Sequence, residues 1–514
     1  MSAPVVHPPL EGLDRLFMTI ALAGASFMVV LDTSIANVSI PGISGELGVS
    51  PSQGTWIITS FAVSNAIAVP LTGWLARRVG EVRLFVLSML LFSLASLGCG
   101  LSPSMPVLIA FRVMQGAVAG PMMPLSQTLL LSIYPQDRRA MALAIWSLTT
   151  LVAPVAGPIL GGWITDNLHW PWIFYINVPI GIFCMWLIWG RMRERESKTV
   201  KVPIDRVGLA LLVIGVGALQ IMLDKGQELD WFNSTTVVGL AIVAALCIAL
   251  LVVWELTEEH PIIDLHLFQD RNFTAAAIAV STAYVVFFAT VVILPLWLQT
   301  QMGYTPTWAG LVMAPTGVLA IVTTPFIGKN MNRLDPRMLA TFGFIVFALC
   351  AFLRAKFEPG ADFHTLAMPQ WIQGIAVACF FVPLTTIALS SMRPQQMASA
   401  AGLFNFLRIL SGGAGTSIAT TMWNRREALH HAQLVENVTA FSPAASSYLG
   451  QLQAGGNDPT AALGIVDRVI NGQAYSMATA DLSYLAAWIF IALIPLLWLA
   501  RPPFGHGGAP VAAD

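Results

Sequence analysis

The sequence predicts an all-α polytopic membrane protein, and three features of its composition support this fold class. Of its 514 residues, 56% are hydrophobic and only 10% are charged, whereas soluble domains carry about 25% charged residues. The apolar residues gather in blocks of about 20, the length of a helix that crosses a bilayer. These blocks lack the alternation of a membrane barrel, so helices are expected throughout. The 26 basic and 27 acidic residues leave no basic excess to neutralise phosphates, which excludes nucleic acid as a partner.

Fourteen apolar blocks are long enough to span a membrane. Their expected limits are 15–40, 55–76, 84–101, 106–131, 140–163, 171–190, 206–223, 235–254, 273–296, 307–327, 338–354, 367–391, 398–422 and 482–500. Lysine and arginine support this count, because cytoplasmic loops are enriched in them. With the N-terminus inside, eighteen fall in cytoplasmic segments, six in outer loops (Arg354 among them) and two within spans. Both termini are therefore expected in the cytoplasm.

An internal repeat relates the two ends of the chain. Gln115-Gly116 and Gln373-Gly374 stand 258 residues apart, and Pro124 and Pro383 stand 259 apart. The shift of 259 also relates Ser132, Pro135 and Gln136 to Ser391, Pro394 and Gln395. It moves one span onto the eighth span after it, which predicts a 6+2+6 plan of two six-helix halves around two inserted helices. Duplicated halves with a central site are a common transporter design.

This plan predicts the domain organisation. The expected segments are a cytoplasmic tail (1–14), a six-helix bundle (15–190), a cytoplasmic linker (191–205), two inserted helices (206–254), a second linker (255–272), a second six-helix bundle (273–500) and a C-terminal tail (501–514). The second bundle contains a polar, periplasmic stretch, 423–481, which is either a solvated insert or a docking surface. Its paired His430 and His431 lack further ligands in the sequence, so no metal site is expected.

Among the acidic residues, only Asp32 lies well inside an expected span. A carboxylate is expensive at that depth, so it usually faces a partner or a pathway. Arg112 is the expected partner, because a rise of 1.5 Å per residue places the two side chains about 14 and 9 Å from the outer surface. Such a pair is a candidate for loading and releasing a proton. The alternative is a structural Asp32 that is hydrogen-bonded to Thr33, Ser34 or Asn37.

Arg408 is the second cation within a span, about 16 Å deep by the same rise. The second half of the chain offers no acid at that depth. This predicts an anionic ligand, although Asn405 or backbone carbonyls could satisfy Arg408 instead. Asn37, Gln115 and Met122 are also expected to contact substrate.

The span 140–163 is expected to act as a conformational element. Its residues Pro154, Gly157, Pro158, Gly161 and Gly162 combine bends with small surfaces. Proline removes a backbone donor and bends a helix, and glycine lets a neighbouring helix approach closely. The cluster therefore predicts a tightly packed helix, which either rocks during transport or simply packs.

No phosphate-binding loop is present, because Gly328-Lys329 lacks both the upstream glycine and the following Ser or Thr. ATP is therefore an unfavourable candidate for the energy source. An ion gradient is expected instead, with no cofactor.

Four motifs resemble those of the major facilitator superfamily. They are Gly73 to Gly80 between spans 2 and 3, Leu108 to Gly116 in span 4, Gly157 to Gly162 in span 5, and Leu31 to Val38 in span 1. The last is similar to the motif of the 14-helix drug–proton antiporters. Almost the whole chain resembles the EmrB-type multidrug exporters. The resemblance implies a major facilitator fold with fourteen transmembrane helices in a bacterial inner membrane.

The resemblance also implies a function and partners. Such proteins exchange lipophilic, often acidic, toxic compounds for protons, together with a periplasmic adaptor of the EmrA type and an outer-membrane channel of the TolC type. It implies proton coupling at Asp32 and Arg112, and a conformational role for Gly73, Gly80 and the charges beside it. One departure is that Arg77 replaces the family's usual acid and Glu81 its usual base. A gating ion pair here would be reversed in sense.

Two other functions are compatible with parts of the sequence. A dedicated exporter of one metabolite or fatty acid class would use the same fold. A membrane enzyme would need paired acids, histidines or a nucleophile near the surface, and the outer loops hold only scattered candidates. The repeat favours alternating access, so a transporter is predicted and an enzyme is not.

Overall fold

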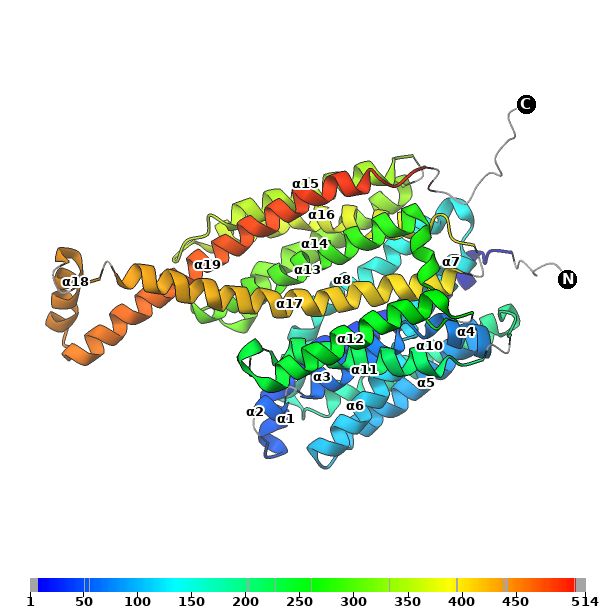
Figure 1. The fold of residues 1–514 in the computed structure, drawn as a ribbon, viewed down its shortest axis with the longest axis horizontal. Helices are drawn as coiled ribbons and strands as arrows, with labels where there is room; N and C mark the ends of the chain where they lie inside the picture. Colours follow the sequence, from blue (N-terminus) through cyan, green and yellow to red (C-terminus); the bar gives the residue numbers. More distant parts are fainter. Residues whose placement is uncertain are drawn as a thin grey trace.

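The computed structural model describes residues 8–504, except residues 50, 55, 201–202, 227, 260, 332, 394–395, 437, 440–441 and 503. Every regular element in this part of the chain is a helix, as the sequence predicts. Two helical bundles lie side by side, with a helical hairpin projecting from one end (Figure 1). Of the repeated residues, Pro394 and Gln395 lie outside the described part.

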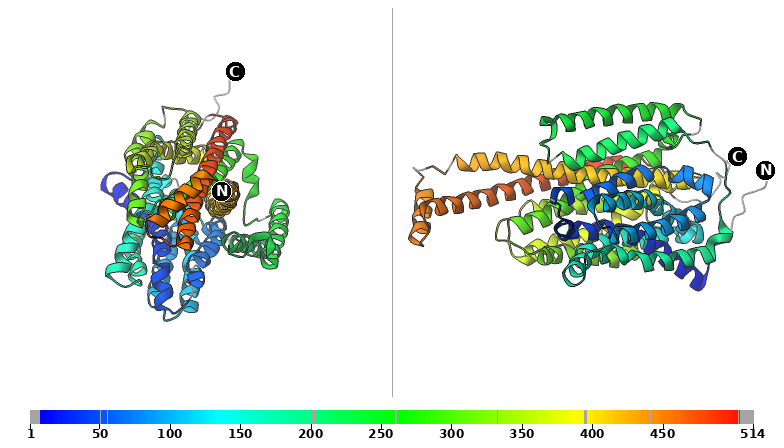
Figure 2. Two further views of the ribbon diagram at one scale, coloured as in Figure 1. Left: turned by 90° about the vertical axis from the view of Figure 1, so that its left-hand side faces the viewer. Right: turned by 90° about the horizontal axis from the view of Figure 1, so that it is seen from below.

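The first bundle and the inserted pair occupy residues 12–257. The helices are α1 (Gly12–Glu46), α2 (Pro51–Gly54), α3 (Trp56–Ala68), α4 (Thr72–Val79), α5 (Glu81–Gly100), α6 (Met105–Ala119), α7 (Met122–Ile133), α8 (Arg139–Asn167), α9 (Trp172–Tyr175), α10 (Asn177–Met192), α11 (Arg206–Lys225) and α12 (Thr235–Thr257). Helix α11 packs on α3 and α17, and α12 packs mainly on α11. The pair therefore forms a separate layer beside the two bundles (Figure 2).

The second bundle follows. Its helices are α13 (Arg271–Thr300), α14 (Pro306–Asn330), α15 (Pro336–Arg354), α16 (Phe363–Leu389), α17 (Met397–Val435), α18 (Pro443–Ala454) and α19 (Pro459–Leu497). Short 3-10 turns connect several elements. Phe344, Phe347, Phe380 and Phe490 contact one another at the centre of this bundle, with the centroids of the contacting rings 4.9 to 6.0 Å apart. This aromatic cluster joins α15, α16 and α19.

Each of the fourteen expected spans falls on one helix or on two consecutive helices. Eleven helices among the described residues are long and apolar enough to cross a membrane, and α3 with α4, bent by 63°, makes twelve. Helices α8 and α17 fall outside that count. The multi-span fold is thus confirmed, whereas the number fourteen and the cytoplasmic termini stay predictions.

The polar stretch 423–481 is largely helical rather than a simple loop. Helix α17 continues to Val435 and α19 begins at Pro459, so both extend beyond the bundle, with α18 across their tip (Figure 1). Asp481 forms an ion pair with Arg426 at 3.0 Å and a hydrogen bond with His430 at 2.8 Å. A helix that projects into water needs no continuous apolar face, so the polarity of this stretch does not distinguish a helix from a loop.

The two bundles touch at the end where α1 begins and α19 ends. There Ala144 of α8 packs with Met331 and Val382 of the second bundle. Asn405 of α17 donates a hydrogen bond to Gln127 of α7 at 2.8 Å. This is the end that the basic residues predict to be cytoplasmic, so the bundles are in contact on the predicted cytoplasmic side.

The turn between α4 and α5 depends on Gly80. Its φ of +99° and ψ of +148° belong to a region that other residues adopt only under strain. The Glu196 carboxylate lies against this glycine and accepts hydrogen bonds from the backbone N–H groups of Val82 at 3.0 Å and Arg83 at 2.9 Å. An acidic group is favourable at a helix N-terminus. The linker after α10 is thereby anchored to the start of α5.

Candidate functional site

Asp32 lies at the centre of a buried polar cluster in the first bundle. Nη1 of Arg112 donates to its Oδ2 at 2.6 Å, and the two residues are 2% and 0% exposed. Its Oδ1 accepts from Nε2 of Gln115 at 3.1 Å and from Nδ2 of Asn177 at 2.7 Å. Three donors from α6 and α10 therefore converge on one carboxylate of α1. These are the partners that a buried ionised carboxylate requires.

Arg112 is also held by groups other than Asp32. Its Nε donates to the Ile57 carbonyl at 2.9 Å, and its Nη1 donates to Oε1 of Gln115 at 2.7 Å. Its guanidinium carbon lies 4.4 Å from the ring centroid of Phe61 and 5.6 Å from that of Phe174. Aromatic faces attract a cation by their quadrupole. The position of Arg112 therefore does not depend on Asp32 alone.

Ser96 and Asn177 complete the cluster, and the sequence reading missed both. Ser96 accepts from Gln115 at 3.2 Å and from Asn177 at 3.0 Å, and donates to the Phe174 carbonyl at 2.9 Å. Charge was the signal that the sequence reading followed, and these residues carry none. Polar side chains within apolar blocks were the available clue.

Helix α8 packs closely on α1 just beyond Asp32. Gly157 lies against Ser34, where a Cβ would overlap the serine side chain and backbone, and Gly161 lies against the backbone of Ile35. The predicted close approach is thus present at both glycines. Pro154, Pro158, Gly162 and Asn37 lie in these helices, but their surroundings fall outside what the structure describes.

Arg408 and Asn405 lie at the junction of the two bundles. The Arg408 guanidinium carbon is 5.5 Å from the ring centroid of Trp146 in the first bundle and 5.6 Å from that of Tyr284 in the second. Arg408 is 5% exposed. Among the described residues, no carboxylate lies within ion-pair distance of it. The positive charge therefore meets aromatic faces rather than an acid.

Two residues expected at the substrate pathway have other surroundings. The Gln115 amide is used within the Asp32 cluster, where its oxygen accepts from Arg112 and its nitrogen donates to Asp32 and Ser96. Met122 is fully buried in the apolar core of the first bundle. Neither side chain has a free surface that points to a ligand in this conformation.

The loop between α4 and α5 has a different charge pair from the one expected. Gly73 lies against Ser399 of α17, at the junction of the bundles. Within the described residues, no ion pair involves Arg77 or Glu81. The charges that meet here are Arg83 and Glu196, 3.8 Å apart. The acid comes from the linker after α10, a segment that lies far away in sequence.

Four more charged residues are buried than the sequence predicts. Arg354 is 5% exposed, Lys225 and Asp205 are 9% exposed, and Glu255 is fully buried. All four were expected in loops or near span ends. The sequence shows how far a residue lies from the end of its helix, but it does not show whether neighbouring helices cover that residue. In the structure, the helix ends that carry these four residues are covered by neighbouring segments.

Comparisons with known proteins agree with the fold. Residues 22–416 match the family model described as Major Facilitator Superfamily. The chain is 54% identical over 501 residues to the multidrug export protein EmrB of Escherichia coli K12, covering 97% of this chain and 98% of that protein. It is 48% identical over 502 residues to the fatty acid resistance protein FarB of Neisseria gonorrhoeae, covering 98% and 99%. The solved structure of the proton:xylose symporter XylE aligns with a TM-score of 0.56 at 13% identity, covering 94% of this chain and 96% of that one.

Substituting Gly157 with alanine tests the contact between α8 and α1. The added methyl group would meet Ser34, and such overpacking costs about 1–3 kcal/mol. We expect a lower thermal midpoint for the purified Gly157→Ala protein and slower drug efflux from cells. Gly239→Ala is the matched control, because nothing lies within 4 Å of a Cβ at Gly239. Equal midpoints and efflux for the two variants would contradict the close contact.

Proposed function

Since this chain belongs to the major facilitator superfamily, we propose that it exports lipophilic, often acidic, toxic compounds in exchange for protons. It is a multi-pass protein of the bacterial inner membrane. A proton gradient supplies the energy and no cofactor or catalytic step takes part. The observation that carries this proposal is the fully buried Asp32–Arg112 pair, with a distance of 2.6 Å between charged atoms.

Protonation of Asp32 is the proposed coupling step. A proton on the carboxylate cancels its charge and weakens the charge-assisted bonds from Arg112, Gln115 and Asn177. Arg112 keeps the Ile57 carbonyl, the Gln115 oxygen and two aromatic faces. Proton binding therefore loosens α1 from α6 and leaves Arg112 with neutral partners alone, one of its nitrogens, Nη2, having no hydrogen-bond partner. The paired and protonated forms of Asp32 would then favour different conformations.

Helix α8 is the proposed link between this change and the opening of the transporter. It contacts α1 at Ser34 and Ile35, immediately beyond Asp32. It also reaches α14 and α16 of the second bundle. A shift of α1 would thus move α8 and the contact around Ala144, because Gly157 has no side chain to separate α8 from α1.

Asp32→Asn tests the coupling. Asparagine cannot carry the proton, so we expect loss of substrate transport driven by an imposed pH gradient in proteoliposomes, whereas substrate binding without a gradient is retained. Asp14→Asn is the matched control, because Asp14 lies on the same helix in an exposed ion pair with Arg191. Gradient-driven transport by Asp32→Asn at the wild-type rate would refute the proposed role.

Arg408 is the proposed contact for acidic substrates. It is a buried cation at the junction of the bundles, held by aromatic faces and without an acid among the described residues. A substrate anion would supply the opposite charge when the junction opens.

We expect Arg408→Ala to lose export of acidic compounds more than that of neutral ones, and Arg408→Lys to keep part of the difference. Initial rates for one acidic and one neutral drug in proteoliposomes give the comparison. Arg425→Ala is the control, because Arg425 is exposed on the same helix. An equal loss for both drugs would assign Arg408 a purely structural role.

The helical hairpin of α17, α18 and α19 is the proposed docking surface for a periplasmic adaptor of the EmrA type, which in turn reaches an outer-membrane channel of the TolC type. It projects beyond the bundles (Figure 1) and exposes apolar side chains, namely Leu429, Val435, Tyr448, Leu463 and Val469. Exposed apolar groups on a projecting element are typical of an interaction surface.

Replacing residues 429–469 by a short glycine–serine linker tests this assignment, because it removes all five of these apolar side chains. Because the polar clusters lie within the bundles, we expect unchanged gradient-driven transport in proteoliposomes. Resistance of cells to the same drug should fall toward that of a strain without the transporter. Full resistance with the shortened hairpin would place the adaptor contact elsewhere.

A further inference from the structure

The second bundle contains a counterpart of the Asp32 cluster. Nη2 of Arg354 donates to Oε1 of Gln370 at 2.7 Å and to Oε1 of Gln373. Gln370 and Gln373 stand 258 residues after Arg112 and Gln115, the shift of the internal repeat. Arg354 comes from α15 and the glutamines from α16, as Ser96 and Arg112 come from α5 and α6. Both halves therefore build a buried arginine–glutamine cluster on matching helices.

The counterpart cluster lacks a carboxylate. Within the described residues, no acid lies within ion-pair distance of Arg354, and its Nε and the Nε2 of Gln370 are buried without a partner. Thr290 stands 258 residues after Asp32, so a neutral side chain takes the place of the acid. An arginine that is 5% exposed with unused donors needs an anion.

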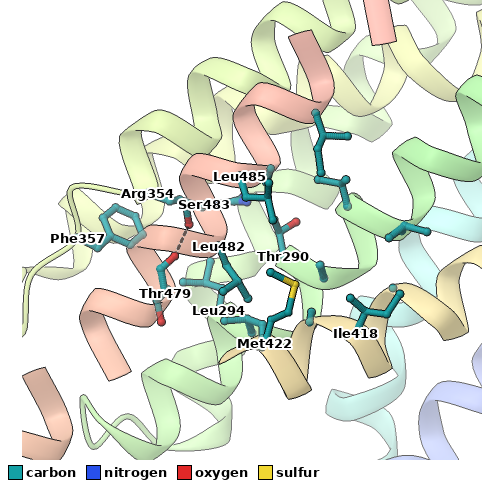
Figure 3. Close-up of a pocket in the computed structure, with 18 residues that line it drawn as sticks. Thr290, Leu294, Arg354, Phe357, Ile418, Met422, Thr479, Leu482, Ser483 and Leu485 are labelled. Carbon is teal, nitrogen blue, oxygen red and sulfur yellow. Dashed lines mark hydrogen bonds between the residues drawn. The ribbon is translucent and has the colours of Figure 1, made fainter. Parts of the chain in front are cut away.

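A pocket lies where the carboxylate is missing. It has a cavity volume of about 100 Å³ and is lined by Arg354, Thr290 and side chains of α13, α17 and α19 (Figure 3). The cavity therefore leaves a small apolar space beside the Arg354 side chain.

The walls of the pocket suit an apolar molecule. They include Ile293, Leu294, Ile418, Met422, Leu482 and Leu485. The hydroxyl groups of Thr290, Thr479 and Ser483 already donate to main-chain carbonyls. The unused donors among the described lining residues therefore belong to Arg354, at one edge of an apolar space.

We propose that this pocket binds an amphipathic monocarboxylate, with its carboxylate on Arg354 and its apolar body between α13, α17 and α19. The ligand supplies the negative charge that Asp32 supplies in the first bundle. A fatty acid from the bilayer and a compact aromatic acid from solution share this chemistry. The Arg354 pocket is separate from the Asp32–Arg112 pair. Binding of a carboxylate to this pocket can therefore be measured at equilibrium, without a proton gradient and without transport.

Equilibrium binding of radiolabelled dodecanoate to the purified full-length protein in nanodiscs tests the site. We expect saturable binding that unlabelled dodecanoate displaces and dodecanol does not, because the alcohol lacks the charge. Arg354→Gln should weaken dodecanoate binding about tenfold or more, the effect of losing a charge-assisted pair. Displacement by 2-naphthoate would extend the ligands to aromatic acids, and its absence would restrict them to bilayer-derived fatty acids.

A second pair of variants keeps the test decisive if Arg354→Gln is unstable. Thr290→Asp places a carboxylate in the same pocket and should pair with Arg354, which would displace dodecanoate and raise the thermal midpoint. Thr290→Asn introduces a side chain of nearly the same shape as aspartate but without the charge. This variant should bind dodecanoate as the wild type does. Equal binding by Thr290→Asp and Thr290→Asn, or displacement by dodecanol as effective as by dodecanoate, would overturn the proposal. Loss of gradient-driven export in Asp32→Asn leaves this binding unchanged, so the two proposals fail separately.

Discussion

The ion pair between Asp32 and Arg112 is the interaction around which the first bundle is arranged. Two opposite charges at this depth persist only if they pair with each other and with further polar groups. That requirement brings α1, α3, α5, α6 and α10 to one point, through Ile57, Ser96 and Asn177. Helix α8 packs on the same part of α1 through Gly157, so a shift of α1 also requires a shift of α8. The ion pair and the packing of α8 therefore both restrict the position of α1.

The two halves use the same framework with different electrostatics. In the first half the chain provides both signs of charge. In the second half the cation remains, the position of the acid carries Thr290, and a pocket is present. If both proposals hold, a duplicated scaffold divides two tasks between its copies, proton carriage by Asp32 in one and anion binding by Arg354 in the other, on matching helices.

The sequence was sufficient for the features that depend on length and on isolated charges. Apolar blocks located each helix, although α17 and α19 extend well beyond the expected limits into the polar stretch, and depth along the helix paired Asp32 with Arg112. Features that depend on lateral packing were not accessible. Arg354 read as a loop residue because it ends α15, yet neighbouring helices cover it. Ser96 and Asn177 carry no charge, and Glu196 reaches α5 from a distant linker, so no local pattern marked them. The repeat held one unused clue, since its shift already aligned Gln370 with Arg112.

Helix α17 runs without interruption from the junction of the bundles to the tip of the hairpin. Its 39 residues amount to a rod about 58 Å long at 1.5 Å per residue. Asn405 and Arg408 lie near one end, and His430 lies near the other, where Asp481 ties it to α19. A rotation of about 5° at the junction would displace the far end of such a rod by about 5 Å. A protein seated on the hairpin would therefore sense the orientation of the transporter mechanically, before any substrate reached it.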